Sequence, residues 1–305
     1  MNIIKSYLYG FKRTGIITRV VTIIYGVTLL LGLILALTFN SVMTNNFLNR
    51  SSLYELLHDF NFTIYSDFMN NYGDLIKPLM NIMICLGFFY FVFTVFFSGG
   101  ILKLFEGSSI KSKSQAFFAG SVKFFSRFLR LGIYILIFQV IGFAVIAIGF
   151  SSIFNRSLPI SAEPKLFTII VVWVVVHLLY FIFVSIVSDY AKIILVKEDS
   201  KKVWRAIWMS FKFTVRKIYL TFPLYLILLI MPVLLVVAYF WAEGIVGMTS
   251  VPGIVIMFFI QQVFIWTRIF SKTWILGSEH DLFLSYLVYK TKPLITQEIL
   301  LDESL

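Results

Sequence analysis

The stretch LFTIIVVWVVVHLLYFIFVSIVS (residues 166–188) decides the fold class, because it runs 23 residues without a charged side chain. At about 1.5 Å per residue, an apolar helix of about 20 residues crosses the hydrocarbon core of a bilayer. Five further stretches of 20 or more residues are equally free of charge. Together they predict an all-α, polytopic transmembrane helical bundle with six spans, at residues 20–39, 79–102, 131–154, 166–188, 218–242 and 244–267.

The composition fits a chain that is solvated mainly by lipid. Hydrophobic residues make up 59% and charged residues 13%, whereas a soluble domain carries about 25% charged residues. The longest segment between predicted spans, residues 40–78, is too short to build an independent core. We therefore expect a single membrane domain over residues 1–305, with a small helical cap at 40–78 and a cytoplasmic tail at 268–305.

Lysine and arginine are distributed unevenly between the two sides of the predicted spans. Of the 26, 22 lie in the N-terminal segment, the second and fourth connections and the tail, and four lie in the remaining connections. Because basic segments stay on the cytoplasmic side, both termini are predicted to be cytoplasmic. Attraction to anionic lipid on that side accounts for the net charge of +11, so nucleic acid is not an expected partner.

Two of the basic connections resemble each other. SVKFFSR (residues 121–127) and SFKFTVR (residues 210–216) match at four of seven positions, and each precedes an odd-numbered span. Residues 6–19 occupy the same place before the first span. This pattern predicts three hairpins joined by amphipathic cytoplasmic helices, with chance similarity between basic, aromatic segments as the alternative.

The connection at residues 199–216 shows how such a helix would be built. At 100° per residue, Trp204, Trp208, Phe211 and Val215 form an apolar stripe beside a stripe of basic residues. Phe213 points the other way and is expected to pack on protein. The pattern suits a helix in the membrane interface, but a helix that caps the bundle without specific lipid recognition is the favoured interpretation. The candidate contacts to anionic lipid are Lys202, Arg205, Lys212, Arg216, Lys123 and Arg127.

No motif in the sequence indicates catalysis. The phosphate loop GxxxxGK[ST], the zinc helix HExxH and the nucleophile elbow GxSxG are all absent from the sequence. The three histidines are far apart, and the polar groups around His58 and around Glu279, His280 and Asp281 lack the spacing of a metal site, so solvated charge is expected there. The sequence predicts a protein that is not an enzyme, with no cofactor and no metal.

A polar cluster is predicted near the middle of the membrane. His177 is the twelfth residue of its span, with Gln139 in the third span and Gln261 or Gln262 in the sixth at comparable depth. A polar side chain there is expected to face the bundle interior. Its functional interpretation is a proton relay or a contact to a solute, and its structural interpretation is an interhelical hydrogen bond.

An ion pair is predicted between Asp189, which follows the fourth span, and Arg268, which follows the sixth. Both residues lie at the inner ends of their helices, so the pair would join those two ends.

Two runs carry a resemblance to known proteins. SGGILKL (residues 98–104) leaves the second span, and SDYAKIILVKEDSKKVWRA (residues 188–206) leaves the fourth. Together they resemble uncharacterised bacterial six-span integral membrane proteins, a group similar to the membrane domain fused to some glycerophosphodiester phosphodiesterases. The phosphodiesterase domain is absent here, so no catalytic residue is carried over. The resemblance implies a location in the bacterial cytoplasmic (inner) membrane.

Two functions of different classes follow. The first is a non-enzymatic integral membrane protein, a scaffold or accessory subunit that organises lipid or a partner protein, with a homo-oligomer as a further possibility. The second is a transporter or lipid-handling permease that uses the polar cluster around His177. A fifth span broken at Pro232 and a wet cavity at that cluster would favour the second.

Overall fold

The computed structural model describes residues 3–47, 62–107, 112–157, 163–247 and 250–302, and within them the only regular structure is helical. Six of the helices are long and apolar enough to cross a membrane, which confirms the predicted class of an all-α, multi-pass membrane protein. The helices are α1 (Ile3–Ile16), α2 (Thr18–Phe47), α4 (Phe62–Glu106), α5 (Lys113–Ser157), α6 (Glu163–Lys197), α7 (Val203–Arg216), α8 (Ile218–Val246) and α9 (Val251–Asp302).

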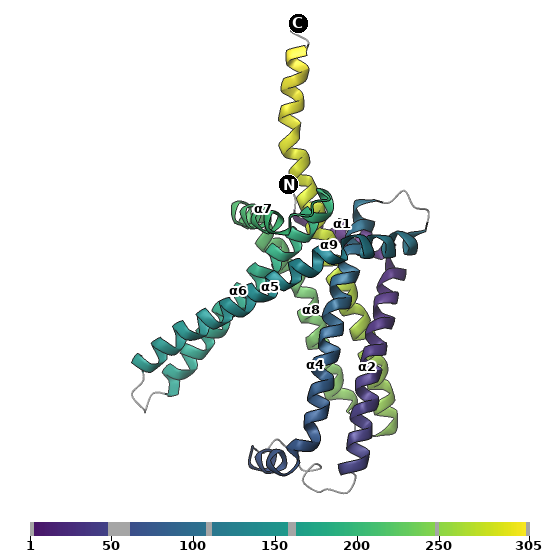
Figure 1. The fold of residues 1–305 in the computed structure, drawn as a ribbon, viewed down its shortest axis with the longest axis vertical. Coiled ribbons are helices and arrows are strands. Elements are labelled where there is room, and N and C mark those ends of the chain that lie inside the picture. Colours follow the sequence, from purple (N-terminus) through teal and green to yellow (C-terminus); the bar gives the residue numbers. More distant parts are fainter. Residues whose placement is uncertain (1–2, 48–61, 108–111, 158–162, 248–249, 303–305) are drawn as a thin grey trace. The chain divides into compact units, whose positions relative to one another are not determined.

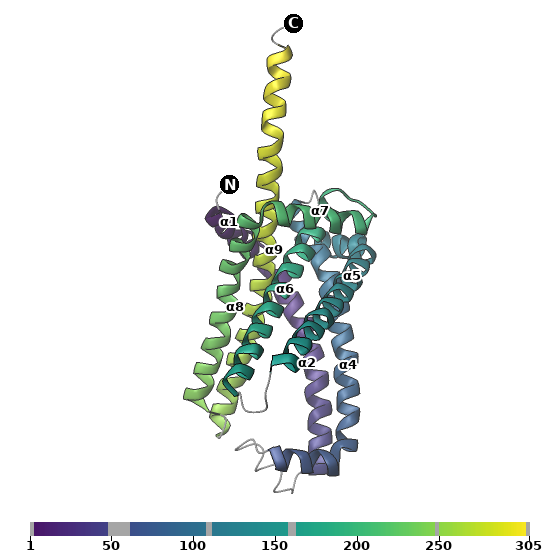
Figure 2. The same cartoon turned by 90° about the vertical axis from the view of Figure 1, so that its left-hand side faces the viewer.

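The chain divides into two compact units, of which the smaller is Thr22–Thr94. In this unit α2 and α4 run alongside each other in both views, and the first turns of α4 lie across its remainder (Figures 1 and 2). Near that end Lys77 pairs with Asp74 at 2.5 Å. The predicted cap at residues 40–78 is therefore partly helical, because α2 continues into it as far as Phe47 and α4 begins within it at Phe62. Residues 48–61 of the predicted cap lie outside the described residues.

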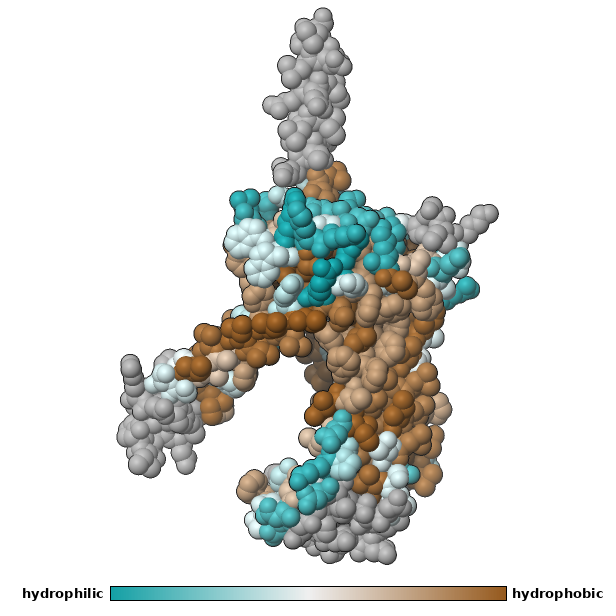
Figure 3. Space-filling model, in the orientation of Figure 1, coloured by the Kyte–Doolittle hydropathy of each residue, from teal (hydrophilic) through white to brown (hydrophobic). Residues whose placement is uncertain are grey.

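The larger unit comprises Met1–Val21 and Val95–Leu305, and its buried side chains gather at one end of its helices. We call this region the hub: α1, α7, and residues 95–106, 113–131, 182–197 and 269–283. Large side chains there are fully buried, among them Leu102, Phe117, Phe124, Tyr190 and Leu195. Large hydrophobic side chains farther along the spans are exposed, as expected of surfaces that face lipid. Figure 3 shows hydrophilic residues over α7 and hydrophobic residues along α5 and α6.

Small residues bring the helices of the hub into close contact. A side-chain carbon placed on Gly100 of α4 would lie 2.5 Å from the carbonyl oxygen of Phe117 in α5. A Cβ on Gly10 of α1 would lie 2.6 Å from the backbone nitrogen of Ser278 in α9. Backbones approach this closely only where no Cβ intervenes. The hub is therefore a set of tightly crossed helices rather than a loose cap.

The end of the fifth span differs from the sequence prediction. The predicted fifth and sixth spans are separated only by Glu243, but α8 continues to Val246 and passes through Pro232 without a break. The turn falls at Gly247, whose φ is 64° and whose N–H donates to the carbonyl of Glu243 at 3.0 Å. Glycine adopts this left-handed conformation without strain, and it commonly ends helices in this way.

The predicted tail at residues 268–305 is not a separate segment in the described residues. Helix α9 continues without a break from the sixth span to Asp302. Ile269, Trp274, Leu276 and Leu282 of this stretch are buried in the hub. Apolar side chains therefore continue the core contacts of α9 beyond the point where the charge-free run ends.

Candidate functional site

One face of α7 is fixed to the protein. Ser210 is fully buried, and its hydroxyl donates a hydrogen bond to the carbonyl oxygen of Val187 in α6 at 2.5 Å. The ring of Phe213 packs against Tyr190 of α6 and Phe283 of α9, with ring centroids 4.9 and 5.2 Å apart. This orientation of Phe213 is the one expected from the sequence, and it leaves the opposite face of α7 outside the core.

The opposite face of α7 presents aromatic side chains. Trp204 is 63% exposed and Trp208 is 55% exposed. The ring of Trp204 contacts Tyr134 and Phe138 of α5, with centroids 6.1 and 6.0 Å apart. Trp208 stacks on Phe211 at 5.7 Å. The aromatic face therefore continues onto the surface of α5 at the hub end of that span.

The basic residues of α7 and of its N-cap flank this aromatic face. Lys202, Arg205, Lys212 and Arg216 are all exposed, and the ammonium of Lys212 lies 5.2 Å from the centroid of the Trp208 ring. Within the described part of the chain, none of the four forms an ion pair with a carboxylate. Their charge is therefore not neutralised by the hub.

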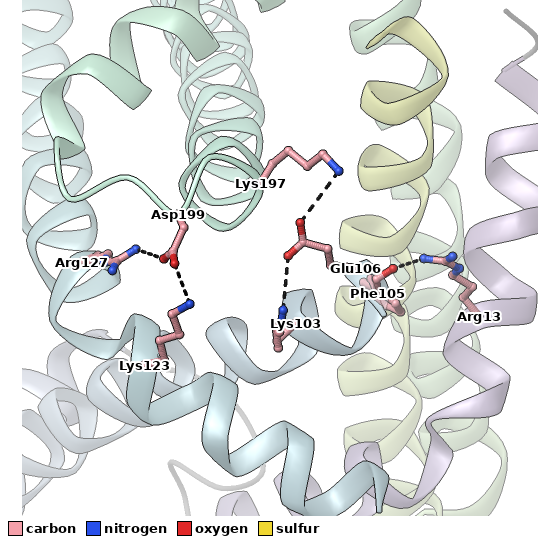
Figure 4. Close-up of polar contacts among 8 residues, drawn as sticks. All are labelled: Arg13, Lys103, Phe105, Glu106, Lys123, Arg127, Lys197 and Asp199. Carbon is pink, nitrogen blue, oxygen red and sulfur yellow. Dashed lines mark hydrogen bonds and ion pairs between the residues drawn. The ribbon is translucent and has the colours of Figure 1, made fainter. Parts of the chain in front are cut away.

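The two other candidate lipid contacts already have protein partners. Lys123 and Arg127 of α5 bind the carboxylate of Asp199 at 2.7 and 2.6 Å (Figure 4). Asp199 precedes α7 and has a φ of 46°, a left-handed conformation that aspartate tolerates better than most residues. Hydrogen bonds from Lys123 and then Arg127 hold the pKa of Asp199 below its usual range. This clamp ties α5 to the turn between α6 and α7.

A second set of polar contacts joins the ends of α4, α6 and α1. The carboxylate of Glu106 lies 3.7 Å from Lys103 and 3.9 Å from Lys197 of α6. The guanidinium of Arg13 in α1 donates to the carbonyl oxygen of Phe105 (Figure 4). Three elements far apart in the sequence thus converge at the end of α4, which none of the sequence motifs indicated.

The ion pair predicted between Asp189 and Arg268 is not the one in the structure. Asp189 instead binds Lys192, one turn further along α6, at 2.7 Å. The nearer cation on the same helix face satisfies the carboxylate without requiring two helix ends to meet.

The expectation of solvated charge at residues 279 and 280 was wrong. Glu279 is 1% exposed and His280 is 3% exposed. Neither carboxylate oxygen of Glu279 has a hydrogen-bond partner, and the ring of His280 lies 6.2 Å from that of Phe105. The signal for this burial was the row of apolar and small residues around it, such as Gly277 and Phe283. His58 lies outside the described residues.

The predicted midplane cluster is divided between two pairs of helices. The ring of His177 contacts Phe143 of α5 at 4.8 Å, and its Nδ1 atom is buried without a hydrogen-bond partner. Gln261 of α9 donates instead to the hydroxyl of Tyr239 in α8 at 3.0 Å. Gln139 and Gln262 are half-buried. Nδ1 of His177 therefore forms no hydrogen bond to a glutamine.

Comparisons with known proteins do not place the chain in a family. No family model, curated protein or solved structure matches it, so the resemblance to bacterial six-span proteins stays a prediction. Among the described residues, no group of three or more histidine, cysteine, aspartate or glutamate side chains is placed to hold a metal ion. The candidate functional site is therefore the exposed, cationic and aromatic face of α7 on the hub.

Proposed function

We propose that this chain is a non-enzymatic integral membrane protein, a scaffold or accessory subunit that organises lipid or a partner protein at its cytoplasmic face. The observation that carries the proposal is the hub itself. Its helices are tightly packed and fixed by buried side chains, while charged and aromatic groups of α7 point outward from it. A rigid platform with an unneutralised outer surface is suited to holding another molecule in a fixed position.

We propose that the chain contains a threefold repeated arrangement of a short amphipathic helix and a membrane hairpin. Ile101 lies 89 residues before Tyr190, which lies 89 residues before Glu279, and all three are buried in the hub. They lie on α4, α6 and α9 respectively. The same spacing separates Ser121 from Ser210, and both side chains are fully buried.

Helix α1 supports the same arrangement. Its small residues Ser6, Gly10 and Thr14 are buried, while Leu8 is 58% exposed and Phe11 is 49% exposed. It therefore resembles α7 in having one face buried on the protein and an apolar face outside. Two such helices on one hub would give the protein an extended interfacial surface.

The distribution of lysine and arginine supports a cytoplasmic position for the hub. Within the larger unit, the beginning of α1 and the end of α9 lie on the same side of the spans in both views (Figures 1 and 2), as an even number of crossings requires. We place the protein in the inner membrane of a bacterium, with both termini in the cytoplasm, on the strength of these observations and of the resemblance.

Site-specific photocrosslinking in cells tests the scaffold proposal. A photoreactive residue replaces Lys12 on α1 or Ser126 on α5, both exposed positions of the hub, and the matched control carries it at Val237 within the span of α8. The proposal expects one protein adduct of defined mass, or a dimer of the chain, from the hub positions and not from Val237. Lipid adducts alone at all three positions would contradict a protein-binding role.

The permease remains a second candidate because Nδ1 of His177 is buried without a partner in the middle of a span. Two observations favour the scaffold over it: α8 is continuous through Pro232, and Gln261 is bonded to Tyr239. His177→Leu separates the two functions. Loss of uptake of a solute with unchanged thermal stability would favour the permease, whereas altered stability alone would identify a structural histidine.

A further inference from the structure

We propose that the exposed face of α7 binds an anionic phospholipid of the membrane in which the chain lies, with the phosphate held by Arg205 and Lys212. The inference deepens the proposed function and rests on it for the position of the hub at the cytoplasmic membrane surface. It separates the six basic residues predicted to contact lipid into two groups, of which only the α7 group has no carboxylate partner among the described residues.

The depth of α7 follows from its aromatic contacts. Trp204 touches Tyr134 and Phe138, which belong to a helix that crosses the membrane. Phe211 touches Phe183 of α6 at 6.0 Å, another membrane helix. Indole rings are enriched where hydrocarbon meets headgroups, because they present an apolar body and one polar N–H. The stripe therefore lies at the level of the headgroups, with its rings toward the acyl chains.

The pairing of charges indicates the sign of the ligand. Lys123, Arg127 and Lys197 of the hub each face a carboxylate, whereas Arg205 and Lys212 face none within the described residues. Lys212 is also held over the face of Trp208, so its ammonium is positioned beside the aromatic stripe. A negatively charged group at the membrane surface complements this arrangement, and a zwitterionic headgroup does so less well.

Lipid is favoured over the other occupants of such a surface. A second copy of the chain carries the same net charge of +11, which opposes association through this face. An acidic protein from the cytoplasm would meet the basic stripe but would leave the indoles of Trp204 and Trp208 outside an apolar environment. A phospholipid supplies both the anion and the acyl chains in one molecule.

Quenching of tryptophan by brominated lipid tests the proposal on the full purified chain in lipid nanodiscs. Brominated phosphatidylglycerol is titrated into a phosphatidylcholine background, and brominated phosphatidylcholine is titrated in parallel. The signal from α7 is the difference between the chain and its Trp204→Phe/Trp208→Phe variant. We expect half-maximal quenching of α7 at a lower mole fraction of the anionic than of the zwitterionic lipid.

The decisive comparison is between two variants that each lose two positive charges. In Arg205→Gln/Lys212→Gln we expect the mole fraction of anionic lipid at half-maximal quenching to rise by about tenfold or more. The reason is that each basic residue near the surface strengthens binding to anionic lipid severalfold. In the control Lys123→Gln/Lys197→Gln, which removes paired charges, we expect little change. Melting temperatures of both variants show whether each is folded.

Three results would overturn the proposal. Equal losses in the two variants would indicate a general surface potential, and no loss in either would remove the role of the α7 cations. Equal quenching by both lipids in the unmodified chain would leave the surface to an acidic protein. Because the nanodisc sample contains no partner protein, the result is independent of whether photocrosslinking detects one.

Discussion

Substitution of Gly10 by alanine should separate α1 from the hub. A Cβ atom at this position would lie 2.6 Å from the backbone nitrogen and 2.8 Å from the Cα of Ser278, and it would also meet the hydroxyl oxygen of that serine. Real Cβ atoms essentially never approach other heavy atoms within 3.0 Å. Backbone atoms of a packed helix cannot yield as a flexible side chain does, so α1 must move.

The magnitude follows from two opposing effects. Overpacking in a well-packed site costs about 1–3 kcal/mol, and alanine in a helix gains about 0.5–1 kcal/mol over glycine. The clash is with backbone, so the cost should fall in the upper part of its range, and the net loss should be about 1–2 kcal/mol. Gly15 of the same helix provides the matched control, because a Cβ there meets nothing within 4 Å. Gly15→Ala should be neutral or slightly stabilising.

Thermal unfolding in detergent micelles measures the difference. At about 2–4 °C per kcal/mol, the two alanine variants should differ in melting temperature by several degrees, with Gly10→Ala the lower. Near-ultraviolet circular dichroism reports the same event, because the indole of Trp274 donates to the carbonyl oxygen of Tyr7 at 2.9 Å across this interface. Equal melting temperatures for the two variants would refute the close contact between α1 and α9.

Three further predictions concern polar groups of the hub. Ser210→Ala should lower stability by about 1 kcal/mol, because it removes a buried hydrogen bond, whereas exposed Ser126→Ala should not; equal melting curves would show that the bond contributes nothing. The hydrogen bonds from Lys123 and Arg127 lower the pKa of Asp199, so they should stabilise the fold above about pH 4 and stop doing so as the pH falls through the lower folded-state pKa. Asp199→Asn should therefore reduce the loss of melting temperature at acid pH. An unchanged loss would mean that another group causes the acid sensitivity. Glu279→Met should be neutral or should stabilise the fold by up to about 4 kcal/mol, because it replaces a buried carboxylate whose oxygens have no hydrogen-bond partner. A large loss of stability would mean that the fold requires the charge.

The spans were predictable because the hydrocarbon core imposes a simple requirement on length and charge. Five of the six charge-free stretches lie within single helices, and most of the sixth lies in α9, which begins at Val251; all six of these helices meet the requirement. The faces of α7 were also predictable, since helical periodicity places Phe213 opposite Trp204 and Trp208. These features depend only on residues that are close together in the sequence, so the pattern of apolar and charged residues is enough to predict them.

The hub was not predictable in the same way, because its contacts join segments far apart in the chain. The residues that decide it are small, such as Gly10 and Gly100, and glycine carries no signal of its partner. The burial of Glu279 was missed because a charged residue suggests solvent, although its apolar neighbours continue the core of α9. The turn at Gly247 was missed because a charge at Glu243 does not end a helix, whereas glycine does.

Native extraction in polymer nanodiscs, followed by mass spectrometry of the intact complex, tests the central proposal most directly. A scaffold or accessory subunit should be recovered with a protein in fixed stoichiometry, either a distinct partner or a second copy, and Gly10→Ala should weaken that association by disturbing the hub. Recovery of the chain alone, with a bound solute whose retention requires His177, would contradict the scaffold and establish the permease in its place.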